Sequence, residues 1–192
     1  MMLFRLTSAT TEETAPPRQG QLPEALLLRV AEEDPAAFEE LYRRTDRAVF
    51  AFALSILRDR QDAEDVMQET YLRIRTHAGA YRPGGNPMAW VLTIAKNLSL
   101  MRLRGAGRLI PVENLPEEDA TPGPETSVQD RMVLSAALAE LEDPQRQIVL
   151  LHAVTGLKHR EIAAMLSLPL PTVLSKYNRA LKKLQLAWKE AN

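Results

Sequence analysis

Apolar residues return every three or four positions through most of the chain, which is the spacing of an amphipathic α-helix. The pattern begins near Glu24, continues after Asp34-Pro35, resumes after Asp62 and returns after Asn86-Pro87. Asp-Pro and Asn-Pro pairs favour helix starts, because the first side chain can cap the helix and proline fits its first position. No segment shows a convincing alternation of apolar and polar residues, so the pattern predicts an all-α protein.

Three stretches interrupt this helical pattern. Residues 79–86 contain a glycine pair and a proline, which predicts a loop. Residues 105–127 are rich in glycine, proline and acidic residues and predict a flexible linker, while residues 1–21 predict a flexible tail. We therefore expect two small helical domains, residues 22–104 and 128–192, joined by a flexible acidic linker.

Composition narrows the class of protein. The chain has 192 residues, of which 45% are hydrophobic and 26% are charged, so two small cores are possible. We expect no membrane insertion, because no apolar run approaches the length of a membrane span, and Met1–Leu6 is too short for a signal peptide. The absence of cysteine excludes disulfides and thiolate metal sites and fits a cytoplasmic protein.

The net charge of −1 conceals strong segregation of charge along the chain. An acidic cluster is followed by residues 70–112, which contain seven arginines and lysines and no acidic residue. The charged residues from Lys158 onward are again mostly basic. This distribution predicts two basic surfaces that could contact phosphate, although ordinary solvated helix faces are the alternative interpretation.

Residues 156–184 carry a helix-turn-helix pattern. A short helix over Glu161–Leu166 and a turn over residues 167–170 precede a second helix, expected to begin near Pro171 or Thr172. The apolar face of that second helix would comprise Val173, Tyr177, Ala180, Leu181 and Leu184. Such a helix enters the major groove, although a plain helical hairpin with a solvated basic face is the alternative.

The polar residues left off that apolar face form the predicted DNA-binding set of this helix. They are Thr172, Ser175, Lys176, Asn178, Arg179, Lys182 and Lys183. Lys176 and Arg179 are the best candidates for base or phosphate contacts, and the last two lysines for backbone contacts.

Two segments resemble the second conserved region of bacterial sigma factors: DAEDVMQETYLRIR (62–75) and WVLTIAKNLSLMRLR (90–104). The predicted loop of residues 79–86 separates them. The helix-turn-helix resembles the fourth region of sigma factors, which implies that its DNA-binding set recognises the −35 element of a promoter. Both regions with a short linker are similar to the extracytoplasmic-function (ECF) group of the sigma-70 family, over residues 22–189. The resemblance implies a transcription initiation factor that binds core RNA polymerase and promoter DNA and is not an enzyme.

The resemblance also implies roles for residues in the N-terminal half. The expected core-polymerase surface comprises Asp62, Asp65, Gln68 and Glu69. Helical spacing places its three acids on one face, although acidic residues are also common near helix N-termini. The expected −10 DNA-binding set comprises Tyr81, Arg82, Asn86, Lys96, Asn97, Arg102 and Arg104. Capture of an unstacked base needs an aromatic or polar pocket with nearby cations. Trp90, one turn before Ile94, is expected in the core.

Some residues depart from the family pattern. Leu174 and Leu181 stand where a basic residue is common, Pro171 replaces a small residue and Thr93 replaces a frequent arginine. Because of these departures, the resemblance does not predict the promoter sequence. The acidic linker is either a solvated connector or, as in the family, a segment that passes through the polymerase cleft.

Two other classes of function compete with this interpretation. The runner-up is a regulator that binds an operator without polymerase. An enzyme has little support, because the three histidines are scattered and no metal-ligand spacing or phosphate-binding loop is present. We therefore expect no cofactor and no metal, and the resemblance adds an anti-sigma protein as an expected partner.

Overall fold

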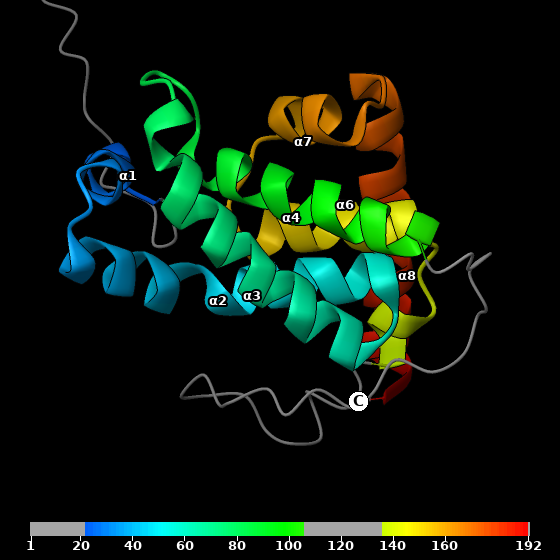
Figure 1. Ribbon diagram of the computed structural model, residues 1–192. Coiled ribbons are helices and arrows are strands. Elements are labelled where there is room, and N and C mark those ends of the chain that lie inside the picture. The colour runs from blue at the N-terminus through cyan, green and yellow to red at the C-terminus, as the bar shows by residue number, and fades with distance from the viewer. Residues whose placement is uncertain (1–21, 106–135, 192) are drawn as a thin grey trace, which may run out of the picture.

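The computed structural model describes residues 22–105 and 136–191, and every regular element in them is a helix (Figure 1). This confirms the predicted all-α fold. The predicted tail, most of the predicted linker and the start of the second predicted domain lie outside the described residues. No helix in the described part of the chain is long and apolar enough to span a membrane.

The N-terminal helices are α1 (Glu24–Ala31), α2 (Pro35–Leu57), α3 (Arg60–His77), a short 3-10 helix (Ala78–Ala80) and α4 (Pro87–Gly105). Helices α2, α3 and α4 pack against one another, and α1 packs on the start of α2 (Figure 1).

Capping side chains fix the starts of three of these helices. Asp34 Oδ1 accepts hydrogen bonds from the first turn of α2 at 2.9 and 3.2 Å, and Asn86 Oδ1 does so for α4 at 3.0 and 3.2 Å. Both predicted cap-and-proline starts are confirmed. Helix α3 begins two residues before the predicted Asp62, because Asp59 caps it by accepting from the Asp62 N–H at 2.9 Å.

The C-terminal helices are α6 (Asp143–Ala153), α7 (His159–Leu166) and α8 (Leu170–Ala191). Residues 136–139 form a helical turn before α6. The sequence, with Asp143-Pro144 as a helix start and Gly156 as a C-cap, predicts a helix that ends at Gly156. This end is wrong, because α6 ends at Ala153 and Gly156 lies in the following loop with φ of +69°. Helix α8 begins at Leu170, slightly earlier than predicted, because the left-handed Ser167 already ends α7.

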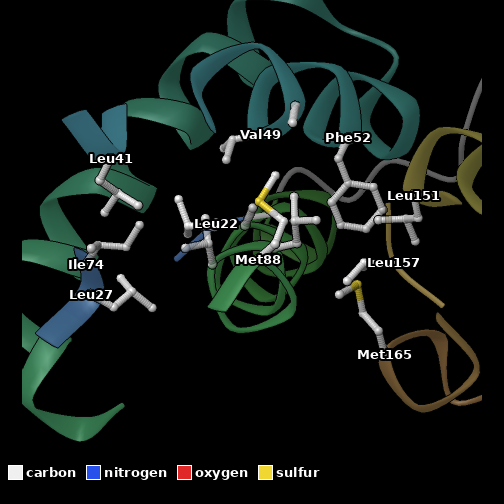
Figure 2. Packing of buried hydrophobic residues seen from close by; sticks show 14 of the residues in the cluster. Leu22, Leu27, Leu41, Val49, Phe52, Ile74, Met88, Leu151, Leu157 and Met165 are labelled. Carbon is white, nitrogen blue, oxygen red and sulfur yellow. The ribbon is translucent and has the colours of Figure 1, made fainter. Parts of the chain in front are cut away.

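One hydrophobic cluster runs through both groups of helices. It joins Leu41 and Phe52 of α2 and Ile74 of α3 to Leu151 of α6 and Met165 of α7 (Figure 2). Phe52 points toward Leu151 across the junction (Figure 2). In this arrangement the N-terminal and C-terminal helices therefore bury apolar surface against each other, which stabilises their packing.

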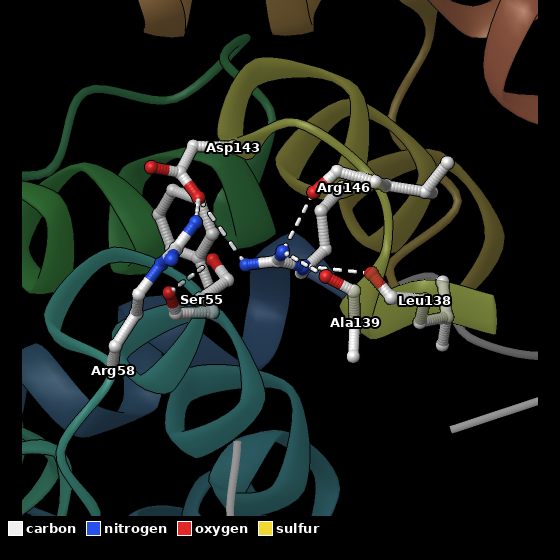
Figure 3. Close-up of polar contacts among 8 residues, drawn as sticks. Ser55, Arg58, Leu138, Ala139, Asp143 and Arg146 are labelled. Carbon is white, nitrogen blue, oxygen red and sulfur yellow. Dashed lines mark hydrogen bonds and ion pairs between the residues drawn. The ribbon is translucent and has the colours of Figure 1, made fainter. Parts of the chain in front are cut away.

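A charged cluster lies at the edge of the same junction. Asp143 accepts hydrogen bonds from Arg58, at the C-terminus of α2, and from Arg146, whose Nη1 lies 3.2 Å from Asp143 Oδ1 (Figure 3). The Arg146 side chain is only 4% exposed and also donates to the carbonyls of Leu138, Ala139 and Leu141 at 2.6–2.9 Å. Burial lowers the pKa of Arg146, and the positive charge of Arg58 lowers it further. We call Arg58, Asp143 and Arg146 the junction cluster.

Candidate nucleic-acid and protein interfaces

The helix-turn-helix forms as the sequence predicts, with one change in its packing. Ile162 of α7 and Val173 of α8 are fully buried, and Ala163 is buried beside them. The sequence pattern predicts that α7 packs through Ile162, Ala163 and Leu166. Leu166 is half-buried against the core, and Met165, which the pattern did not include, is buried. Met165 belongs to the hydrophobic cluster that includes residues of the N-terminal helices, and α7 contacts α8, α6 and α4.

The outward face of α8 collects the predicted −35 set. Asn178, Arg179, Lys182 and Lys183 are exposed, and Arg179 Nη2 donates to Ser175 Oγ at 2.9 Å. Lys176 is half-buried, with its Nζ 3.9 Å from Glu142. A shallow hollow on this face is lined by Pro171, Thr172, Ser175, Lys176 and Arg179. Because Lys and Arg neutralise backbone phosphates, this face can approach duplex DNA.

Two histidines that are separate in the sequence stack between α6 and α8. The rings of His152 and His159 have centroids 4.3 Å apart, and both contact the Tyr177 ring edge-to-face at 5.0 and 4.7 Å. His152 Nδ1 lies 2.8 Å from the Leu157 carbonyl oxygen. Sequence reasoning missed this cluster, because seven positions separate the histidines and a loop brings them together. The stack packs α8 against α6 and α7.

This stack should make the stability of the C-terminal helices depend on pH. Burial, and then the neighbouring His152, lower the pKa of His159 below its usual 6.5. The folded state therefore binds fewer protons than the unfolded chain below about pH 6.5, and stability is lost as pH falls through that range. We expect a lower melting temperature at pH 5.5 than at pH 7.5, measured by circular dichroism, with a smaller difference in His159→Gln. An equal difference in both proteins would contradict this assignment.

The predicted core-polymerase surface lies on α3 and is partly covered by a cation from α4. Arg102 Nη2 lies 2.8 Å from Asp62 Oδ1 and 2.7 Å from Asp65 Oδ2. The hydrogen bond to Asp62 has the largest effect on the pKa of Arg102, and together with the hydrogen bond to Asp65 it raises that pKa. Glu69 pairs with Arg73 at 2.9 Å, and Gln68 is exposed. The structure thus joins Arg102, predicted to contact −10 DNA, to two acids of the other predicted surface.

Tyr81 is buried, although it belongs to the predicted −10 set. Its side chain is 7% exposed and packs edge-to-face on Trp90, with 5.7 Å between ring centroids. Its hydroxyl lies 2.8 Å from Glu24 Oε1 and 3.0 Å from the Gly85 carbonyl oxygen. Burial, and then Glu24, raise the pKa of Tyr81 to about 12. Tyr81 therefore holds the loop onto α1 and offers no free ring face to a base in this conformation.

Two further members of the −10 set contact α7. Asn86 Nδ2 donates to Glu161 Oε1 at 3.0 Å, and Lys96 Nζ donates to the Met165 carbonyl oxygen. Arg82, Asn97 and Arg104 are exposed. Part of the predicted −10 surface is therefore occupied by α7, which packs against the helix of the predicted −35 set. The sequence shows no sign of this, because 75 and 69 positions separate the two pairs of partners.

Comparisons with known proteins match both halves of the chain. Residues 41–109 match the family model of Sigma-70 region 2, and residues 131–184 match that of Sigma-70, region 4. The chain is 32% identical over 185 residues to the ECF RNA polymerase sigma factor SigK of Mycobacterium tuberculosis (strain ATCC 25618 / H37Rv), covering 90% of this chain and 96% of SigK. The SigK of Mycobacterium sp. (strain KMS) is 31% identical, covering 84% of this chain and 88% of that protein.

Solved structures give the same result. The sigma factor RpoE in complex with the anti-sigma factor NepR from Bartonella quintana is 29% identical, with a TM-score of 0.61, covering 79% of this chain and 96% of RpoE. CnrH in complex with the cytosolic domain of CnrY shares the fold at 24% identity, with a TM-score of 0.59, covering 88% of this chain and 97% of CnrH.

Proposed function

The chain belongs to the ECF group of the sigma-70 family and is a transcription initiation factor that directs RNA polymerase to promoters, and we propose how its surfaces divide that work. The observation that carries the proposal is the combination of an acidic face on α3 with a cationic outward face on α8. The first suits a basic protein partner and the second suits DNA. The family acts by recognition of DNA, so we assign no catalytic step to this chain.

The −35 element is assigned to α8. Its N-terminal turns would enter the major groove, as in other helix-turn-helix proteins, with Lys176 and Arg179 near bases or phosphates. Lys182 and Lys183, further along the exposed face, would meet the backbone. The comparisons favour this role within a holoenzyme over that of an operator-binding regulator, because both sigma regions are present in order.

The −10 element is assigned to α4 and its preceding loop, through Arg82, Asn97 and Arg104. Asn86 and Lys96 would join them only after their contacts with α7 break. We therefore propose that the two predicted domains, residues 22–104 and 128–192, separate when the chain engages polymerase and promoter. The packed arrangement would bind −10 DNA weakly, because it leaves part of this surface covered.

An anti-sigma protein is a proposed partner of this chain. The support is the 29% identity to RpoE, a sigma factor whose structure was solved with an anti-sigma factor. The cytoplasm, where core polymerase and promoter DNA are found, is the proposed compartment.

Reversing charge on α3 tests the proposed core-polymerase surface. The double variant Asp65→Lys, Glu69→Lys should bind core polymerase at least about tenfold more weakly, the effect of losing roughly 1.4 kcal/mol. Its matched control is Glu39→Lys, Glu40→Lys on α2, which changes the net charge by the same amount elsewhere. Binding is measured by fluorescence anisotropy of the labelled chain against core polymerase, with helical content checked by circular dichroism.

Arg102→Ala provides a second control for the same surface. It removes the cation that covers Asp62 and Asp65 but leaves both acids in place. We expect it to preserve or strengthen core binding. Normal binding by the α3 double variant, or equal loss in the α2 control, would exclude this face as the polymerase surface.

A further inference from the structure

Two exposed leucines lie at the N-terminal end of the DNA-facing helix. Leu170 and Leu174 are one helical turn apart on α8, and each is 41% exposed. The same i, i+4 stripe continues to Asn178 and Lys182, both of which are exposed. The outward stripe of α8 is therefore apolar in its first turns, polar in the middle and cationic beyond.

The surroundings of these leucines point to DNA rather than to an apolar protein surface. The neighbouring stripe contains Ser175 and Arg179, joined by a hydrogen bond of 2.9 Å. Between residues 170 and 189 the sequence has five lysines and arginines and no acidic residue. Two leucines within such a positive field form a small apolar patch, and the charge around them favours a polyanion.

The major groove contains one apolar group that such a patch can contact. Thymine presents a 5-methyl group there beside its O4 acceptor, whereas the edges of adenine, guanine and cytosine present donors and acceptors. Leucine can satisfy neither a donor nor an acceptor. Opposite any base but thymine it would therefore remove water from polar groups without replacing their hydrogen bonds.

We propose that Leu174, with Leu170 beside it, recognises thymine in the −35 element by contact with its 5-methyl group. This inference rests on the proposed role of α8 and adds specificity to it. Lys176 and Arg179 supply affinity and the polar contacts, and the leucines select A·T pairs whose thymine methyl faces the helix. Leu174 stands where the family commonly has a basic residue, and in this proposal that difference helps to determine which promoters the chain selects.

The test removes single methyl groups from the DNA. Holoenzyme is assembled from core polymerase and the full chain, and its strongest genomic promoter is identified by run-off transcription. Each thymine of the −35 element is then replaced in turn by deoxyuridine, which lacks only the methyl group. Competition binding should show about a fourfold loss of affinity at one or two positions, the value of one buried methyl group.

Variants assign that loss to the leucine. With Leu174→Ala holoenzyme, affinity for the thymine promoter should fall by a similar factor, and deoxyuridine at the sensitive position should cause no further loss. Leu186→Ala is the matched control, because Leu186 is 60% exposed on the same helix, three turns further along. It should retain the full deoxyuridine effect.

Three outcomes would overturn the inference: a −35 element without thymine, no deoxyuridine effect with the unmodified chain, or an undiminished effect in Leu174→Ala. Holoenzymes with Lys176→Ala or Arg179→Ala distinguish failure of the thymine contact from failure of the proposed −35 role of α8. If they lose −35 affinity while deoxyuridine has no effect, only the thymine contact is wrong. If neither substitution weakens −35 binding, the assignment of α8 to the −35 element is wrong as well.

Discussion

Replacing Asp143 with asparagine should separate the two packed groups of helices. Asp143 is the single acid between Arg58 and Arg146 in the junction cluster. The Asp143 side chain is 29% exposed, that of Arg58 is 15% exposed and that of Arg146 is 4% exposed. Asparagine keeps the size of the side chain but leaves two cations facing each other. Breaking a buried ion pair costs about 3–5 kcal/mol, and the partial exposure of Asp143 reduces our expectation to about 2–3 kcal/mol. This corresponds to a shift of roughly 30- to 150-fold toward the open state.

The absence of cysteine in the chain makes this shift easy to measure. Spin labels on cysteines introduced at Leu72 and Val154, which are 60% and 51% exposed, report the distance between the two groups by electron resonance. Asp143→Asn should lengthen and broaden that distance, and should raise the affinity of the free chain for single-stranded −10 DNA, because Asn86 and Lys96 are released.

Two further variants control for general damage in this experiment. Arg58→Gln removes the partner on α2 but leaves Asp143 paired with Arg146, so it should open the chain less than Asp143→Asn. Glu40→Gln removes an exposed surface pair with Arg44 and should change nothing. An unchanged distance distribution in Asp143→Asn would show that the junction cluster does not hold the packed arrangement.

Lys176→Ala and Asn97→Ala should impair different steps of initiation. Lys176→Ala should weaken −35 duplex binding by about 1–3 kcal/mol, the value of a base-specific contact. Asn97→Ala should spare duplex binding and impair strand opening, because Asn97 is exposed on α4 and is assigned to the unstacked strand. Tyr81→Ala is unsuitable for this comparison, since loss of a buried aromatic ring costs about 3–5 kcal/mol of folding stability.

Gel shifts and permanganate footprinting measure the two steps separately, and a template with a pre-melted −10 bubble distinguishes them most sharply. The bubble supplies the unstacking in advance, so it should largely rescue Asn97→Ala and should not rescue Lys176→Ala. Gln185→Ala, on an exposed position further along α8, is the neutral control. If both variants show the same defect on both templates, the assigned division of labour is wrong.

Local signals predicted the helices well. The Asp34-Pro35 and Asn86-Pro87 starts follow from capping and from the fixed φ of proline, both of which act within a few residues. The end of α6 was missed because Gly156 marks a left-handed position in the loop rather than the helix terminus. Glycine in the sequence indicates positive φ but does not specify where the preceding helix stops.

Contacts between distant segments could not be predicted in the same way. The sequence placed Lys96 and Arg102 among cations available to DNA, whereas the structure pairs Lys96 with the backbone of α7 and Arg102 with two acids of α3. Tyr81 was predicted to bind a base because its loop resembles the family element that captures an unstacked base, which needs an aromatic or polar pocket. Its burial depends on Trp90 and on Glu24, 57 residues earlier, and periodicity contains no information about such pairs.

Reconstitution with core RNA polymerase is the most direct test of the central claim that this chain is a promoter-directing initiation factor. Core polymerase alone, the chain alone and the two together are each incubated with genomic DNA fragments, followed by run-off transcription and footprinting. We predict discrete transcripts and a footprint over −35 and −10 elements only for the mixture. A defined duplex footprint by the chain alone, as strong as that of the mixture and without new transcripts, would contradict the claim and identify an operator-binding regulator instead.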